Sequence, residues 1–206
     1  MSASESPAPV RYLALGDSYT LGLGASSRKK SFPTLLARAL AKKSGRLVDI
    51  KNPSANGYTT EDVIRHELSL VDSFKPDVAT ILIGSNDVAH GQTLADYRQS
   101  IQWIYGVLVA VPRVAAISVP DWSVSPVAAQ FGAPALIRQK IEAFNGIARE
   151  EAAGGGFLWV DLGDLSREAA AGEDWIAADG LHPADAQYAA WAEAIWAQLD
   201  PVWTYP

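Results

Sequence analysis

Hydrophobic residues in this chain gather in five short runs that contain almost no polar interruption. The runs are Tyr12–Leu15, Leu47–Ile50, Val78–Ile83, Val114–Val119 and Phe157–Leu162. Nearly continuous hydrophobicity over so few residues is typical of strands that are buried on both faces of a sheet. We therefore expect five strands in a sheet that is covered on both sides.

The stretches between these runs carry hydrophobic residues at helical spacing. In Ser31–Ser44, Leu36 and Leu40 fall on one face, Pro33 suits the first turn, and Gly45 can end the helix. The same kind of stripe predicts three further helices, over Thr93–Val109, Ala135–Ala152 and Pro183–Leu199.

Strands that alternate with helices in this way favour parallel pairing with right-handed crossovers. We expect an α/β protein: a three-layer α/β/α sandwich around a five-stranded parallel sheet, in the flavodoxin-like order 2-1-3-4-5. Residues 10–206 are expected to form a single domain, after a disordered lead-in over residues 1–9.

The composition narrows the classes of function. The chain has 206 residues, of which 49% are hydrophobic and 19% charged, as in soluble globular proteins. A net charge of −6 without a basic run argues against nucleic acid as a partner. The absence of cysteine excludes disulfides, thiolate catalysis and cysteine metal sites. No segment approaches the roughly 20 apolar residues of a membrane span, and the first residues lack the pattern of a signal peptide, so we expect a cytoplasmic protein.

Glycines and polar residues that could take part in catalysis or binding follow most of the predicted strands. Gly16-Asp17-Ser18 follows the first run, Gly57 lies after the second, Gly84-Ser85-Asn86-Asp87 follows the third, and Asp179-Gly180-Leu181-His182 lies beyond the fifth. In parallel sheets, ligands bind beyond the carboxyl ends of the strands. Four such blocks are therefore expected to converge on one site.

These four blocks, in this order, resemble the GDSL, or SGNH, family of serine esterases and lipases. The family is marked by Gly-Asp-Ser, a glycine in a second block, Gly-x-Asn-Asp and Asp-x-x-His. The matching blocks span nearly the whole chain, and the departure is Tyr19, which stands where the family's name has leucine.

The resemblance implies that Ser18 is the nucleophile, that His182 is the base that takes its proton, and that Asp179 orients the histidine ring. It also implies an oxyanion hole made by the backbone N–H groups of Ser18 and Gly57 and the side-chain amide of Asn86. The predicted activity is hydrolysis of a carboxylic ester through an acyl-serine intermediate, without a metal or another cofactor. The partner is then a small-molecule ester, and the sequence sets neither the natural substrate nor the oligomeric state.

Several other residues have a structural interpretation beside a functional one. Asp17 and Asp87 are expected to fix loops by accepting backbone hydrogen bonds. Trp122 and Trp175 fall in connectors near the expected site and are candidates for the wall of an acyl pocket. The connector Asp121–Gly132 is short and polar, which favours acetyl to butyryl groups over long chains. His66 and His90 are weaker candidates for a functional role: His66 lies on a predicted helix among charged neighbours, and His90 follows the third block closely enough to approach the site.

Two other classes of function stay open at this point. Ser18, Thr20 and Gly22 could cradle the phosphate of a flavin in a non-catalytic, flavodoxin-like protein. Alternatively, Asp17, Asn86, Asp87 and His182 could hold the metals of a phosphoesterase, although such sites usually contain more histidines. Within the resembled family, a lysophospholipase or thioesterase is a further alternative.

Overall fold

The computed structural model describes residues 7–168 and 174–203, and its centre is a parallel sheet with the strand order β2-β1-β3-β4-β5. The strands are β1 (Val10–Gly16), β2 (Val48–Lys51), β3 (Val78–Leu82), β4 (Val114–Ile117) and β5 (Leu158–Val160). The predicted fold class and strand order are confirmed. The chain passes from β1 outward to β2 and then back across β1 to β3, so the order reverses beside β1.

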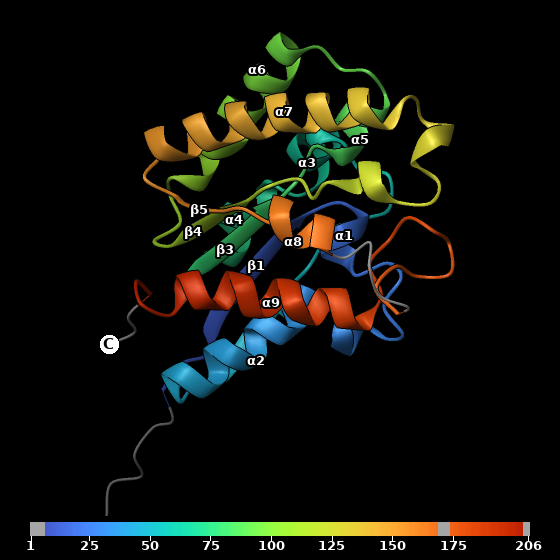
Figure 1. Cartoon of the computed structure of the whole chain (residues 1–206). Coiled ribbons are helices and arrows are strands. Elements are labelled where there is room, and N and C mark those ends of the chain that lie inside the picture. The colour runs from blue at the N-terminus through green and yellow to red at the C-terminus, as the bar shows by residue number, and fades with distance from the viewer. Residues whose placement is uncertain (1–6, 169–173, 204–206) are drawn as a thin grey trace, which may run out of the picture.

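Helices cover both faces of the sheet, as Figure 1 shows. On one face lie α3 (Thr60–His66), α4 (Ser69–Phe74), α6 (Leu94–Leu108) and α7 (Pro134–Gly154). On the other lie α2 (Phe32–Ser44) and α9 (Asp185–Leu199). The four predicted helices correspond to α2, α6, α7 and α9, with ends that differ by at most two residues.

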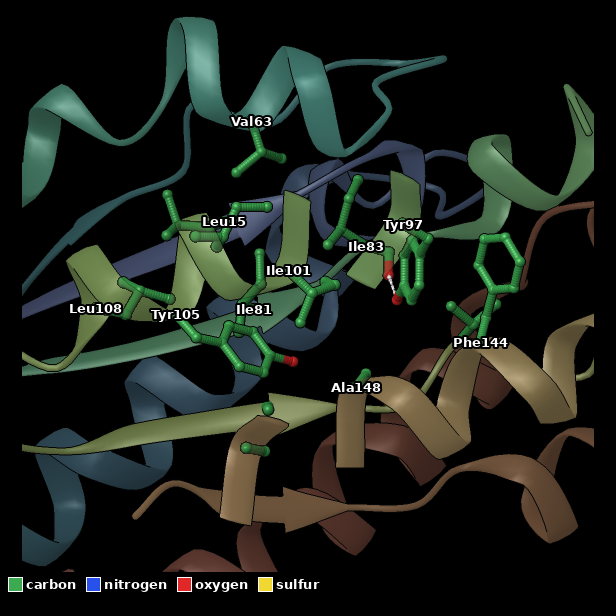
Figure 2. Close-up of a cluster of buried hydrophobic side chains, with 14 of the residues drawn as sticks. Leu15, Val63, Ile81, Ile83, Tyr97, Ile101, Tyr105, Leu108, Phe144 and Ala148 are labelled. Carbon is green, nitrogen blue, oxygen red and sulfur yellow. Dashed lines mark hydrogen bonds between the residues drawn. The ribbon is translucent and has the colours of Figure 1, made fainter. Parts of the chain in front are cut away.

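Alternate residues of β1 supply the two cores. Leu13 and Leu15 are fully buried under α3 and α6, whereas Tyr12 and Ala14 are fully buried against α2 and α9. The close-up of the first core in Figure 2 shows Leu15 and Ile81 among side chains of α6 such as Ile101. Burial on both faces explains why the sequence of this strand is a continuous hydrophobic run.

The edge strands do not share this double burial. In β2, half-buried and exposed residues alternate, and β5 is only partly covered. The prediction of complete burial is therefore wrong for the edges: Val48 and Ile50 of β2 pack against the second core, whereas Asp49 and Lys51 on its other face are exposed.

Short elements that the sequence periodicity did not delimit occupy the carboxyl edge of the sheet. These are α1 (Ser18–Leu21), α5 (Ser85–Ala89), α8 (Gly163–Glu168), and the 3₁₀ turns η1 (Arg28–Lys30), η2 (Trp122–Val124) and η3 (Ala128–Gln130). Figure 1 shows α1 and α5 at the same end of the sheet. α1 carries Ser18, α5 carries Asn86, and η2 carries Trp122 of the predicted site.

The expected disordered lead-in over residues 1–9 falls mainly outside the described residues. Its described part, residues 7–9, is exposed and precedes β1. Within the described part of the chain, no helix is both long enough and apolar enough to cross a membrane.

Candidate active site

Ser18 is the first residue of α1 and lies directly beyond the end of β1. Asp17 caps this helix by accepting a hydrogen bond from the backbone N–H of Tyr19 at 3.0 Å. The strand order reverses at β1, and this is where open parallel sheets form a crevice. Ser18 is 6% exposed, so its hydroxyl lies at the floor of a recess rather than on the surface.

His182 and Asp179 reach Ser18 from the loop before α9. The Ser18 Oγ lies 3.0 Å from His182 Nε2, and His182 Nδ1 lies 2.6 Å from Asp179 Oδ2. Since a carboxylate can only accept, Nδ1 carries the proton and Nε2 is free to accept the serine proton. The three side chains therefore have the arrangement in which a histidine can take the proton of a serine hydroxyl.

Asp179 is held as an anion by its local backbone. Partial burial disfavours its charge, but the backbone N–H groups of His182 and Leu181, each 2.9 Å from Oδ1, and the His182 ring outweigh this effect. The pKa of Asp179 is consequently below its ordinary value. An ionised Asp179 can stabilise a protonated His182 ring.

The segment that carries His182 is fastened to the chain just after α1. Ser26 donates from its backbone N–H and its hydroxyl to the two carboxylate oxygens of Asp185, at 2.8 and 2.6 Å. Tyr188 donates to the backbone carbonyl of Leu23 at 2.7 Å. These bonds join the first turn of α9 to the connector that follows the nucleophile, and they fix the base relative to the hydroxyl.

Asn86 is oriented by a backbone carbonyl. Its side-chain N–H₂ donates to the carbonyl of Tyr58 at 2.8 Å, which leaves the second amide hydrogen for another acceptor. The glycine before α5, Gly84, has φ +129°, and a Cβ there would lie 2.9 Å from the Tyr97 hydroxyl. Glycine at this position lets the strand turn sharply and bring Asn86 into the recess.

Gly57 lies on the neighbouring loop, next to Asn56, a residue of the pocket wall. Its φ of +82° favours glycine, while a Cβ would meet no protein atom within 4 Å. Backbone geometry therefore accounts for the glycine at this position. The predicted donation of its N–H to an oxyanion remains a prediction.

A small cavity of about 80 Å³ opens beside the serine and the histidine. Its apolar wall consists of Ala89, Trp122, Phe131 and Leu181, and Asn86 contributes a polar group. Trp122 is 6% exposed, and its ring meets that of Phe131 edge-on at a centroid distance of 5.6 Å. Phe131, which the sequence reasoning missed, belongs to the connector already suspected of forming the wall.

The structure does not bring Trp175 to this cavity. With its amide oriented to satisfy both groups, Gln187 donates to the Trp175 carbonyl at 3.0 Å and accepts from the Trp175 indole N–H at 3.2 Å. Trp175 thus packs against the start of α9 and is not among the described residues that line the pocket. The expectation that it walls the pocket is corrected here.

Neither of the other histidines approaches the serine. His66 is exposed on α3 and stacks on Tyr58 at a centroid distance of 5.6 Å, and His90 is exposed after α5. His182 is the histidine that the structure places in contact with Ser18.

Three carboxyl groups are buried beneath the site. Asp17 caps α1, Asp87 accepts from the backbone N–H and the hydroxyl of Thr60, and Glu67 accepts from the backbone N–H of Gly16 at 3.0 Å. Burial raises the pKa of Asp17 to about 7 and that of Glu67 to about 8. Asp17 and Asp87 fix loops, as the sequence suggested.

Glu67 was not predicted from the sequence, although its spacing from buried valines could have indicated that it is buried. It lies four residues after Val63 and four before Val71, both buried, and so continues the inward stripe of α3. A charged residue in such a stripe indicates a buried partner, here the backbone at the end of β1.

Replacing Glu67 with glutamine is expected to change how stability depends on pH. Unfolded Glu67 titrates near 4.5, so between about 4.5 and 8 the folded protein holds a proton that the unfolded chain has released. The free energy of unfolding of the wild-type protein therefore falls as pH rises through this window. Glu67→Gln has no group that titrates at this position, so its free energy of unfolding lacks this decrease. Urea unfolding at about pH 5.5 and pH 8.5 measures the effect. The free energy of unfolding of Glu67→Gln minus that of the wild type should be larger at the higher pH.

Glu61→Gln, on the exposed side of α3, is the matched control, and it should follow the wild-type pH dependence. Wild-type and Glu67→Gln curves that stay parallel across the window would contradict the assignment of Glu67 as a buried, protonated group.

The residues of the alternative phosphate and metal sites are already engaged. Thr20 is buried with its hydroxyl on the Leu15 carbonyl, and Gly22 packs against Ser31, so Ser18, Thr20 and Gly22 form no open cradle. Both oxygens of Asp87 are occupied by Thr60. Across residues 7–168 and 174–203, no group of three or more histidine, aspartate or glutamate side chains is placed to hold a metal ion.

Comparisons with known proteins place the chain in a family. Residues 14–190 match the model of the GDSL-like lipase/acylhydrolase family. A GDSL-like esterase from Mycobacterium tuberculosis is 28% identical over 205 residues, covering 95% of this chain and 63% of its own length. The chain therefore spans less than two thirds of that relative.

Two solved structures share the fold. A lipase/acylhydrolase from Enterococcus faecalis superposes with a TM-score of 0.73 at 22% identity, over 93% of this chain and 96% of its own. A W215I variant of an acetyl xylan esterase from Geobacillus stearothermophilus gives a TM-score of 0.75 at 17% identity, over 98% and 99%. At these identities the two likenesses establish the architecture.

Proposed function

Because the chain belongs to the GDSL-like lipase/acylhydrolase family, we propose that it hydrolyses carboxylic esters through an acyl-serine intermediate. The observation that carries the proposal is the contact of Ser18 Oγ with His182 Nε2 at 3.0 Å, while Nδ1 of the same ring is fixed by Asp179. A histidine oriented in this way raises the nucleophilicity of an otherwise unreactive hydroxyl.

In the first half of the reaction, Ser18 Oγ attacks the ester carbonyl carbon while its proton passes to His182 Nε2. The carbonyl oxygen becomes an oxyanion, and the donors available to it are the backbone N–H groups of Ser18 and Gly57 and the Asn86 amide. The intermediate collapses when the C–O bond to the alcohol breaks, and His182 returns the proton to the departing oxygen. Ser18 then carries the acyl group.

In the second half, water replaces the alcohol. His182 takes a proton from water, which attacks the acyl carbon, and the second tetrahedral intermediate releases the carboxylic acid and restores the Ser18 hydroxyl. Each proton moves through Nε2, and the Asp179 carboxylate holds the ring throughout.

The cavity beside Ser18 supports a short acyl group. Its volume of about 80 Å³ is smaller than the roughly 150 Å³ cavity that accommodates a benzene molecule. Trp122, Phe131 and Leu181 close it with rigid or branched side chains. We therefore propose acetyl to butyryl esters as the favoured substrates.

A panel of p-nitrophenyl esters of increasing acyl length, together with acetylated sugars and acyl thioesters, tests the proposed function. We expect the wild-type protein to hydrolyse the short esters. No turnover of any ester or thioester by folded protein, together with no covalent labelling of Ser18 by a phosphonate, would refute the proposal.

Replacing Trp122 with alanine is expected to extend the accepted chain length. The change opens the wall to two or three further methylenes, each worth about 0.8 kcal/mol when buried, or roughly fourfold in kcat/KM. The ratio of kcat/KM for octanoate to that for acetate should rise roughly 15- to 60-fold in Trp122→Ala.

The matched control is Trp103→Ala, because Trp103 is 64% exposed on α6 and distant in sequence from the pocket wall. It should leave the length profile unchanged. An unchanged profile in Trp122→Ala would show that Trp122 does not set acyl length, and a wild-type profile rising to palmitate would contradict the short-chain proposal.

A further inference from the structure

Trp122 forms part of the acyl wall, yet no polar group holds its ring. The indole N–H is buried and has no hydrogen-bond partner among the described residues. Its ring is held by packing against Phe131 and by the backbone of η2. The contacts that hold η2 in place therefore also hold the part of the cavity wall that Trp122 forms.

Trp122 borders a second cavity as well. Besides the catalytic cavity, Trp122 lines a second cavity of about 20 Å³ whose other residues include Tyr19, Ile176 and Trp191. Movement of the indole toward this second cavity would enlarge the first. The backbone position of η2 consequently bears on the size of the cavity beside Ser18.

Asp121 holds η2 in place from its N-terminal end. One carboxylate oxygen accepts from the backbone N–H of Ser123 at 3.2 Å and from its hydroxyl at 2.5 Å. The other oxygen pairs with Arg138 Nε of α7 at 3.0 Å and with a guanidinium nitrogen of Arg167 of α8 at 3.6 Å. Asp121 thus connects the turn to two helices.

The Asp121 carboxylate is much more deeply buried than the two arginines that pair with it, so it depends on these ion pairs. The Asp121 side chain is 3% exposed, whereas those of Arg138 and Arg167 are 44% and 39% exposed. A buried carboxylate is stable only while it is paired, and two guanidinium groups that face an open groove of about 280 Å³ provide the pairing. Without them, the carboxylate would move toward water and release the turn that it caps.

We propose that Asp121, Arg138 and Arg167 are positioning residues that hold η2 and Trp122 and thereby limit the acyl length that the site accepts. The proposal rests on the proposed esterase function for its effect on substrates. Its effect on η2 itself does not depend on any activity.

The test compares Arg138→Gln/Arg167→Gln with the wild type and with Arg149→Gln. Arg149 lines the same groove, but among the described residues Asp121 pairs with Arg138 and Arg167 and not with Arg149. Two quantities are measured: hydrogen exchange of the backbone amides in residues 121–132, and the ratio of kcat/KM for p-nitrophenyl octanoate to that for acetate. The ratio does not depend on the fraction of folded enzyme, so a loss of stability alone leaves it unchanged.

We expect faster exchange in residues 121–132 of the double variant, together with a rise in the ratio of roughly 4- to 15-fold, equivalent to one or two further buried methylenes. Arg149→Gln should match the wild type in both measurements. In Asp121→Asn, which can still accept from Ser123 but needs no counterion, the same arginine substitutions should have little additional effect.

Unchanged exchange in the double variant would overturn the proposal, and so would faster exchange with an unchanged ratio. Equal effects in Arg149→Gln would overturn it as well, since groove charge in general would then be responsible. Faster exchange in a protein whose wild type hydrolyses no ester would support the role of these residues in holding η2 and would refute the proposed esterase function instead.

Discussion

Ser18→Ala is expected to lower kcat for a short ester by roughly 10⁴- to 10⁶-fold, because the serine, histidine and aspartate act as a unit. The change removes one oxygen atom from a nearly buried site, so the fold and thermal stability should be close to those of the wild type. A phosphonate should add one covalent group to the wild-type protein, at Ser18, and none to the variant. Steady-state kinetics and mass spectrometry of the digested adduct check both statements.

Ser54 provides the matched control. It is also a buried serine, and its hydroxyl has no hydrogen-bond partner among the described residues. Ser54→Ala should retain wild-type kcat and wild-type labelling at Ser18. Persistent labelling of Ser18→Ala at another residue, or kcat within about tenfold of the wild type, would show that Ser18 is not the nucleophile.

Asn86→Ala has the second largest expected effect. Loss of one oxyanion donor typically costs roughly 10²- to 10³-fold in kcat, while KM changes much less, because the donor acts mainly on charge that develops in the transition state. The comparison of kcat and KM separates this role from simple substrate binding.

The amide of Asn86 also holds the carbonyl of Tyr58, so a control must remove a comparable structural bond elsewhere. Asn145 both donates to and accepts from the backbone of Val119, at 2.9 and 2.8 Å, and does not line the catalytic cavity. Asn145→Ala should cost stability without the loss in kcat. A folded Asn86→Ala variant with near-normal kcat would mean that Asn86 only positions a loop.

The predictable parts of this fold are those in which hydrophobic spacing alone determines the structure. β1, β3 and β4 are buried on both faces, and their sequences contain little else than hydrophobic residues. The long helices α6 and α7 present wide apolar stripes, and their ends were predicted within two residues. Strand and helix alternation then left few topologies to consider.

Short elements were beyond this reasoning. A helix as short as α1 or α5 is not stable by itself, because the cost of nucleation is not repaid within four or five residues. Such helices depend on caps and buried contacts, for example Asp17 on the Tyr19 amide. These contacts depend on tertiary structure and have no local periodicity.

The residues of the candidate site also fall into those that the sequence could predict and those that it could not. Ser18, Asp179, His182 and Asn86 could be named because polar groups after strand ends are conspicuous and because their order resembled a known family. Trp122 and Trp175 were indistinguishable in the sequence, since both are tryptophans in connectors. Their different environments arise from side-chain pairing: Gln187 engages Trp175, whereas the Trp122 indole is left against the cavity.

The bonds between the start of α9 and the connector after α1 have a consequence for how the protein matures during synthesis. Ser26 and Asp185 are 159 residues apart, Leu23 and Tyr188 are 165 apart, and Ser18 and His182 are 164 apart. Closing such large loops is entropically costly, so these contacts should form late. A ribosome-bound chain from which α9 has not yet emerged can already hold Ser18 and much of its sheet in place, whereas His182 is not yet fixed beside Ser18. We therefore expect ester turnover measured during translation to begin only after α9 has docked beside α1.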